Sequence, residues 1–123
     1  MIKVKIFRKT DGNIDKVDVS GHADYDEYGN DIVCSAVSAI VQTAVLGLTR
    51  VLKIKIDLLI EEGILQFKIP KNINNNMYSK VNIILNTMVI GLSEIEKSYD
   101  EHIEIFNIEG GVWYVKYEPT IVR

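Results

Sequence analysis

Two residues in the first third of the chain, His22 and Cys34, have side chains that together can form a nucleophile and its base. Cys34 is the only cysteine, and it lies at the start of a long apolar segment. Asp31 precedes that segment directly and has the side chain of a helix N-cap, which places Cys34 at the third helical position. The free N–H groups and the positive end of the helix dipole favour a thiolate there. A histidine that folds back from the preceding loop can take the thiol proton.

The residue types alone also allow a structural interpretation of both side chains. A single cysteine in an apolar helix is more often a small core residue, and a single histidine is more often a loop residue with a satisfied hydrogen bond. A redox thiol is a further alternative, because a cysteine at a helix N-terminus also reacts with oxidants. The chain has no second cysteine to resolve an oxidised thiol, which disfavours that alternative.

The loop between the two candidate residues, residues 23–30, is acidic and aromatic. We expect Gly21 to permit a backbone angle or a close approach that other residues cannot adopt. The loop is either a solvated surface loop or a lid, in which Tyr25 and Tyr28 cover a bound peptide while Gly29 is part of the hinge. Because it has little apolar content to hold it down, we expect it to be mobile until a substrate orders it.

Two polar residues of the same segment are candidates for supporting roles. Asp31 is interpreted as a helix cap rather than as a group that orients His22, since its position already explains it. Ser38 lies one turn beyond Cys34 on the same helix face. Its hydroxyl either bonds back to a carbonyl of the preceding turn or acts toward the thiolate or the substrate.

Composition limits the class of protein. A chain of 123 residues with 47% hydrophobic and 25% charged residues predicts one soluble domain over residues 1–123. The net charge of −3 speaks against nucleic acid as a direct partner. A single cysteine fits a reducing compartment, and the longest apolar stretch, residues 39–48, is too short to cross a bilayer. We therefore expect a cytoplasmic protein without a signal peptide or a membrane partner.

The remaining chemistry-bearing residues do not form a second site. The two histidines and the cysteine lack metal-ligand spacing, so no metal or other cofactor is expected. His102 has no partner at useful spacing and is interpreted as a strand residue.

Hydrophobic periodicity predicts two helices and three hairpins. The expected strands cover residues 2–6, 14–20, 54–58, 64–69, 102–108 and 112–117, and the expected helices cover residues 32–48 and 77–99. This order, ββα-ββα-ββ, indicates an α+β fold with a largely antiparallel sheet and both helices on one face. The first helix is apolar nearly all round and is expected to be buried on most sides. Because a domain of this size cannot cover such a helix completely, a homodimer is predicted.

The string from Gly21 to Ser38 carries a more specific signal. Gly-His-Ala, five residues, and then Gly-x-Asp-Ile-Val-Cys-Ser-Ala-Val-Ser resembles the signature of the Prp family of ribosomal-processing cysteine proteases. By that resemblance, His22 is the general base and Cys34 the nucleophile, while Asp31 and Ser38 match the remaining polar positions. The hairpin around Trp113 is longer than the family pattern implies.

The resemblance implies a function as well as a site. Such an enzyme is a cytoplasmic homodimeric endopeptidase that removes a short, apolar and aromatic N-terminal extension from the twenty-seventh protein of the large ribosomal subunit. It needs no cofactor, and its partner is the ribosomal protein precursor. The alternative interpretation is a non-enzymatic ribosome-assembly or peptide-binding module, in which the same loop grips a segment without cutting it.

Overall fold

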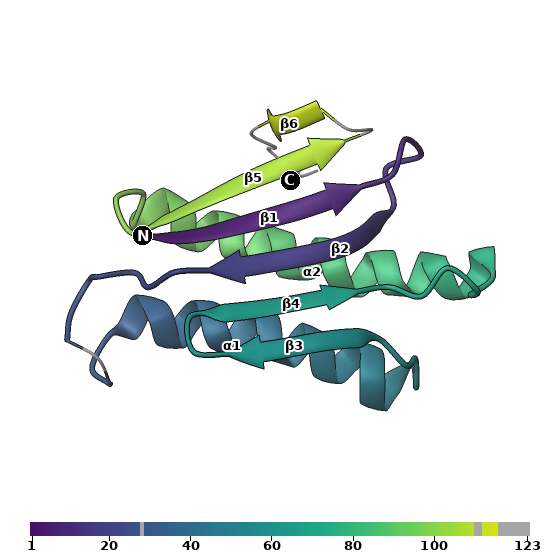
Figure 1. Ribbon diagram of the computed structural model, residues 1–123, viewed down its shortest axis with the longest axis horizontal. Coiled ribbons are helices and arrows are strands. Elements are labelled where there is room, and N and C mark those ends of the chain that lie inside the picture. The colour runs from purple at the N-terminus through teal and green to yellow at the C-terminus, as the bar shows by residue number, and fades with distance from the viewer. Residues whose placement is uncertain (28, 110–111, 116–123) are drawn as a thin grey trace.

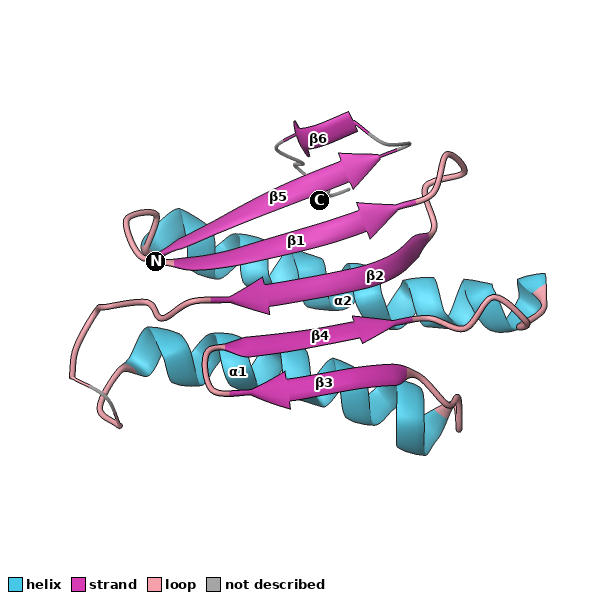
Figure 2. Cartoon of the chain, viewed as in Figure 1, coloured by secondary structure: helices cyan, strands magenta, loops and turns pink. Residues whose placement is uncertain are grey.

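The computed structural model describes residues 1–27, 29–109 and 112–115, and in this part of the chain six strands form one sheet with two helices packed on one face (Figures 1 and 2). The sheet order is β3-β4-β2-β1-β5-β6. The strands are β1 (Ile2–Arg8), β2 (Ile14–Ser20), β3 (Asp57–Glu61), β4 (Ile64–Lys68), β5 (Ile103–Glu109) and β6 (Val112–Val115). The helices are α1 (Ile32–Leu46), which continues into a π-helical turn η1 (Gly47–Val51), and α2 (Asn75–Ser98).

The expected α+β fold with both helices on one face is confirmed. All neighbouring strands run antiparallel except β1 and β5, which pair in parallel. In β1, Ile2, Val4 and Ile6 are buried while the alternate residues, Lys3 and Lys5, are not. This alternation places one face of the strand on the core beneath the helices and the other in solvent.

The predicted position of the third strand was wrong by three residues. The alternation from Ile54 onward belongs to the connection after η1, in which Lys53 has a φ of 55° and Ile54 donates its N–H to the carbonyl of Leu48 at 2.9 Å. Ile54 is buried in the hydrophobic core although it lies in a loop and not in a strand. The strand itself begins at Asp57, because only there does the chain pair with Lys68 of β4.

The expectation that α1 is buried on nearly all sides was also wrong for the single chain. One face of the helix packs on the core through Val33, Val37 and Val41, but Ile32 is 55% exposed and Leu46 is 44% exposed. The sheet and α2 cover only part of the helix circumference. The segment Ile32–Val51 is long and apolar enough to span a membrane, contrary to the length estimate from sequence, although the core helix of a soluble protein passes the same test.

The last predicted hairpin is only partly within the described residues. β6 pairs with β5 through Glu109 and Val112 and through Asn107 and Val115. The expected turn glycines and residues 116–117 lie outside the described residues, as does the side chain of Trp113.

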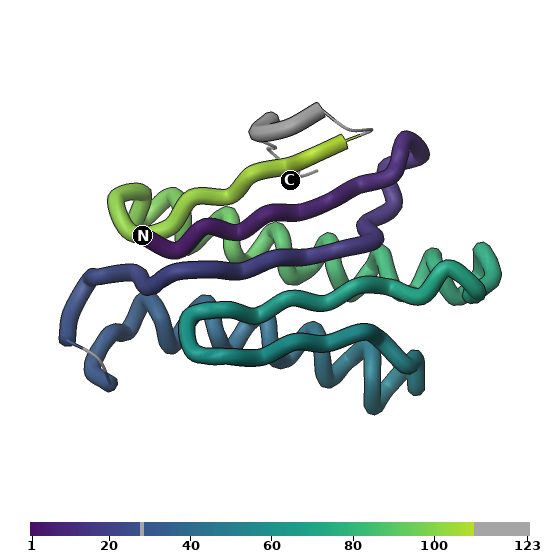
Figure 3. The backbone as a smooth tube through the Cα atoms, viewed as in Figure 1, coloured from purple at the N-terminus to yellow at the C-terminus, as the bar shows by residue number. Residues whose placement is uncertain are grey.

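Several connections come together at one end of the sheet, where strands of the sheet begin and end. The backbone tube shows the end of β2, the start of α1, the β3–β4 turn and the turn between α2 and β5 on the same side of the molecule (Figure 3). His22, which follows β2, and Cys34, in the first turn of α1, both lie at this end. The fold therefore brings segments from the whole length of the chain to the candidate site.

Candidate active site

Asp31 organises the start of α1. Its Oδ1 accepts the N–H groups of Val33 at 2.9 Å and Cys34 at 3.0 Å, as expected of an N-cap. Its Oδ2 accepts two further N–H groups from the preceding loop, those of Tyr25 at 2.9 Å and Asp26 at 3.3 Å. With about four acceptor positions on a carboxylate, these four donors account for its hydrogen-bonding capacity. This arrangement favours the cap interpretation over direct orientation of His22.

The Asp31 carboxyl is ionised more readily than an ordinary aspartate. Its burial, with only 6% of the residue exposed, raises its pKa. The backbone N–H donors, that of Cys34 foremost, act in the opposite direction and leave the pKa of Asp31 lowered overall. The carboxylate is therefore charged under neutral conditions and locks the loop backbone to the first turn of α1.

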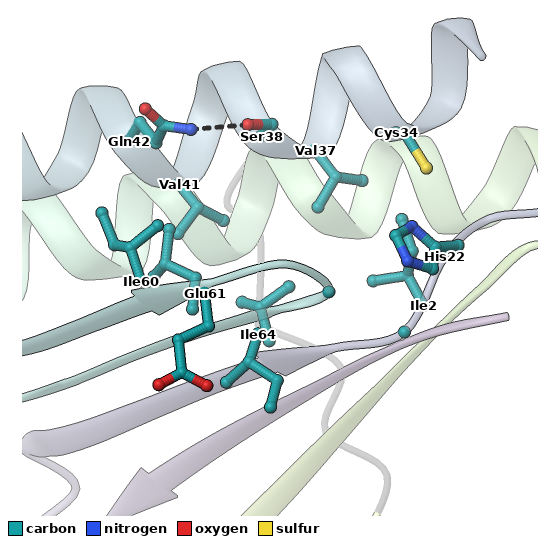
Figure 4. A pocket seen from close by; sticks show the side chains of 14 residues that line it. Ile2, His22, Cys34, Val37, Ser38, Val41, Gln42, Ile60, Glu61 and Ile64 are labelled. Atoms are coloured by element: carbon teal, nitrogen blue, oxygen red, sulfur yellow. Dashed lines mark hydrogen bonds between the residues drawn. The ribbon is translucent and has the colours of Figure 1, made fainter. Parts of the chain in front are cut away.

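Cys34 is the third residue of α1, as the sequence predicted, and its side chain is partly buried. Its Sγ accepts the N–H of Ala23 at 3.2 Å. Figure 4 shows the sulfur pointing from the helix toward the ring of His22. A thiol with a backbone donor, a helix N-terminus and a neighbouring imidazole has the surroundings that activate a nucleophile.

Two glycines fix the position of His22. Gly21 has a φ of +89°, and a Cβ there would overlap the carbonyl oxygen of Met1, so the close approach expected from the sequence is confirmed. The N–H of Gly21 donates to the carbonyl of Gly63 in the β3–β4 turn at 2.9 Å. Gly63 in turn lies against the imidazole, because a Cβ added to it would be 3.2 Å from Nε2 of His22. Nothing in the sequence indicated this role of Gly63.

His22 and Cys34 line two adjoining cavities whose other lining residues differ in type. One, of about 190 Å³, lies between α1 and the β3–β4 hairpin, as Figure 4 shows, and its walls include Val37, Val41 and Ile60. The other, of about 490 Å³, lies against the loop. Its remaining walls are polar and consist of Asp24, Asp26, Gly29, Asp31, Ser35 and Ser38. An extended peptide laid across the sulfur can therefore place apolar side chains on one side.

Ser38 lines both cavities, and its hydroxyl does not bond back to a carbonyl of the preceding turn, while a role toward the thiolate or the substrate stays a prediction. Its Oγ accepts a hydrogen bond from Nε2 of Gln42 at 2.7 Å, one turn further along α1 (Figure 4). The hydroxyl therefore belongs to the wall of the site. Its hydrogen bond is to the side chain of Gln42 and not to a carbonyl of the preceding turn.

The first half of the loop is better anchored than its composition indicated. The ring of Tyr25 makes edge contacts with Tyr99 and His102, with ring centroids 5.4 and 5.2 Å apart. Ala23 is 1% exposed. His102 was wrongly interpreted as a strand residue without a partner, since it precedes β5 and its Nδ1 lies 2.8 Å from the carbonyl oxygen of Ala23. Tyr28 lies outside the described residues, and the mobility of the loop stays a prediction.

Within the described ranges, no group of three His, Cys, Asp or Glu side chains is placed to hold a metal ion. The candidate chemistry of the site is thus carried by a sulfur, an imidazole and backbone N–H groups.

Several known proteins that resemble this chain in sequence and fold are cysteine proteases. A family model described as cysteine protease Prp matches residues 1–104. The ribosomal processing cysteine protease Prp of Staphylococcus aureus (strain Mu50) is 35% identical over 108 residues, which are 85% of this chain and 97% of the relative. That of Bacillus subtilis (strain 168) is 27% identical over 107 residues, which are 85% of this chain and 96% of the relative.

The fold comparison agrees with the sequence comparison. The crystal structure of an essential ribosomal processing protease Prp from S. aureus, in complex with a covalently linked product peptide, superposes with a TM-score of 0.79 and 30% identity, covering 87% of this chain and 99% of that one. Family membership favours the enzymatic interpretation of the sequence over the binding-module alternative. The chain belongs to the Prp family, and it is a cysteine protease.

Proposed function

We propose that this protease removes a short N-terminal extension from the precursor of the twenty-seventh large-subunit ribosomal protein, with Cys34 as nucleophile and His22 as general base. The observation that carries the proposal is the environment of the sulfur. Cys34 Sγ accepts a backbone N–H, lies at the start of α1, and shares both adjoining cavities with His22. A solved relative holds a covalently linked product peptide, which supports attack by a protein nucleophile in this family.

The mechanism follows from these positions. His22 takes the proton of Cys34, and the thiolate attacks the scissile carbonyl carbon, which places negative charge on the carbonyl oxygen. The N–H groups of Val33, Cys34 and Ser35 already donate to Asp31, so the start of α1 would stabilise this oxyanion through the positive end of the helix dipole rather than through these three donors. The protonated His22 then gives its proton to the leaving amine, and water releases the extension from the sulfur.

The shape of the site supports an apolar, aromatic extension as substrate. The cavity between α1 and the β3–β4 hairpin is walled by aliphatic side chains and opens beside the sulfur. Its volume of about 190 Å³ suits one or two large apolar side chains. The polar cavity on the loop side suits the remainder of the precursor.

We further propose a single cysteine-protease domain over residues 1–123 that acts in the cytoplasm as a homodimer, without cofactor, nucleic acid or membrane. The dimer proposal rests on the family resemblance and on an apolar groove of about 670 Å³ between α1 and α2. Val51 and Ile83 on this groove are 75% and 70% exposed. A second copy of the chain would cover these side chains.

The cleavage proposal is tested with the purified protein and the precursor of the ribosomal protein. Mass spectrometry should find the mature protein and the free extension as products. Cys34→Ala should fold normally and release no product, because an alanine fits the partly buried position and cannot attack a carbonyl. Product formation by Cys34→Ala would contradict the nucleophile assignment, and an intact precursor with the wild-type enzyme would contradict the substrate.

A further inference from the structure

The backbone of Ala23 is held at both ends by side chains far from it in the sequence. Its N–H donates to Sγ of Cys34 at 3.2 Å, and its carbonyl oxygen lies 2.8 Å from Nδ1 of His102. The residue is 1% exposed, so water does not compete for either contact. Ala23 therefore connects the imidazole of His102 to the sulfur of Cys34.

The direction of the second hydrogen bond is fixed by chemistry. A carbonyl oxygen only accepts, so Nδ1 of His102 carries the proton and donates. The backbone of His102 is itself fixed, because its N–H donates to the carbonyl of Tyr99 at 2.8 Å and its carbonyl accepts the N–H of Ile2 at 2.9 Å. The donor thus stands on a rigid turn between α2 and β5.

The other side of the same loop is fixed independently. Tyr25 packs its ring edge-on to His102 and donates its N–H to Oδ2 of Asp31. Asp31 in turn accepts the N–H of Cys34. His102 is the member of this arrangement that determines the orientation of the Ala23 backbone, whereas Asp31 determines the orientation of the helix start.

We propose that His102 is a positioning residue for the nucleophile: by holding the carbonyl of Ala23, it keeps the N–H of Ala23 directed at the sulfur of Cys34 and so favours the thiolate. The proposal rests on the proposed function of Cys34. A hydrogen bond donated to a charged sulfur stabilises the charged form and depends on direction. Without the His102 donor, the Ala23 segment is free to turn its N–H away.

The charges around the sulfur make this donor important. His22 faces Cys34 from the end of β2, and its protonated form favours the thiolate. Carboxyl groups also line both cavities, namely those of Asp24, Asp26 and Asp31 on the loop side and that of Glu61 on the side of the β3–β4 hairpin. The N–H of Ala23 is a neutral donor that contacts the sulfur itself.

The test compares His102→Asn, His102→Asp and His102→Ala. The amide nitrogen of asparagine is as many bonds from the backbone as Nδ1 of histidine, so it can donate to the same carbonyl. Aspartate has the same shape and no donor, and alanine removes the donor without adding a charge. Because Cys34 is the only thiol, its alkylation by iodoacetamide can be followed by mass spectrometry across a pH series without any substrate.

We expect the alkylation profile of His102→Asn to follow that of the wild-type protein. Those of His102→Ala and His102→Asp should move to higher pH, with alkylation at neutral pH slower by about tenfold, the loss of one hydrogen bond to a charged group. Circular dichroism should find all three variants folded. If His102→Ala fails to fold, His102→Leu, which is close in size to asparagine and has neither a donor nor a charge, takes its place in the comparison.

Coincident profiles for the wild-type protein and the folded variants without a donor would overturn the proposal. So would an asparagine variant that behaves like the alanine variant. The test separates this proposal from the proposed function: shifted profiles in a protein that cleaves no precursor would leave the His102 role standing and the protease substrate wrong. Unchanged alkylation profiles in an enzyme that cleaves the precursor would contradict the role of His102 and leave the proposed substrate standing.

Discussion

Gly63 and His22 lie side by side at one end of the sheet. The Cα of the glycine faces the imidazole, and Nε2 is the ring atom nearest to the position of an added Cβ. The contact joins the β3–β4 turn to the end of β2. A Cβ at residue 63 would be 3.2 Å from the nitrogen, so the imidazole would have to shift by a few tenths of an ångström. The turn therefore sets the distance at which His22 faces Cys34.

Gly63→Ala should impair cleavage beyond its effect on stability. Gly63 has a φ of +72°, so an alanine there is strained by about 1–2 kcal/mol as well as pressed against the ring. Gly12→Ala is the matched control, because Gly12 has a φ of +87° in the β1–β2 turn and no atom within 4 Å of an added Cβ. We expect similar losses of melting temperature in both and a loss of kcat/KM of tenfold or more, ~1.4 kcal/mol, only in Gly63→Ala. Equal activities would contradict the contact as a determinant of His22.

Asp31 should make stability depend on pH in the acid range. The pKa of Asp31 is lowered in the folded state, so its carboxylate contributes stability at every pH above the unfolded value of about 3.9. This contribution is lost as the pH falls below that value through the folded pKa. Asp31→Asn cannot titrate. The melting temperature of the wild-type protein should exceed that of Asp31→Asn at pH 7, and the difference should shrink toward pH 2.

The same variant separates the two functions of Asp31. Asparagine keeps one acceptor oxygen for the N–H groups of the helix start. Its NH₂ group takes the place of Oδ2 and cannot accept the N–H groups of Tyr25 and Asp26. We expect a loss of about 1 kcal/mol of stability, a modest loss of rate and faster amide exchange at residues 25 and 26. A collapse of activity at unchanged melting temperature and exchange would instead indicate that Asp31 acts on His22.

The loop of residues 23–30 should become more protected when substrate binds. An uncleavable extension peptide added to Cys34→Ala is expected to slow hydrogen exchange across the loop, with the largest change toward Gly29, because Asp31 and His102 already anchor the first half. The β1–β2 turn serves as the internal reference. Equal exchange with and without saturating peptide would show that the loop is not a gate.

The proposed dimer should dissociate when a charge is placed in the α1–α2 groove. Ile83→Glu puts a carboxylate among Ala39, Thr43 and Gly47, where a second copy would have to desolvate it. Light scattering should give a dimer for the wild-type protein and a monomer for the variant at micromolar concentration. Asn72→Glu, an exposed change outside the groove, should stay dimeric. A wild-type monomer would contradict the proposal.

Much of the site was predictable because its signal is local. Asp31 before an apolar run predicts the helix start, and the helix start fixes the position of Cys34 within it. Gly21 was predictable for the same reason, since a glycine next to a candidate base indicates a tight backbone. The fold class followed from the order of periodic segments.

The remaining features depend on contacts between distant segments. Gly63 lies against His22, and His102 contacts Ala23. Both contacts depend on the order of the strands in the sheet, which hydrophobic periodicity does not specify. The shift of β3 has a related cause, because Ile54 alternates like a strand residue yet enters the core from the loop after η1. Such placements are decided by packing rather than by local propensity.

The parallel pairing of β1 with β5 has a consequence for the order in which the surroundings of His22 and Cys34 are completed during synthesis. Ile2 pairs with Ile103, so the second neighbour of β1 is made only after about a hundred further residues have been synthesised. A nascent chain that already contains His22 and Cys34 lacks β5 and the turn that carries His102. The segments that hold His22 and Cys34 are therefore synthesised early, and the strand and the turn that complete their surroundings are synthesised last.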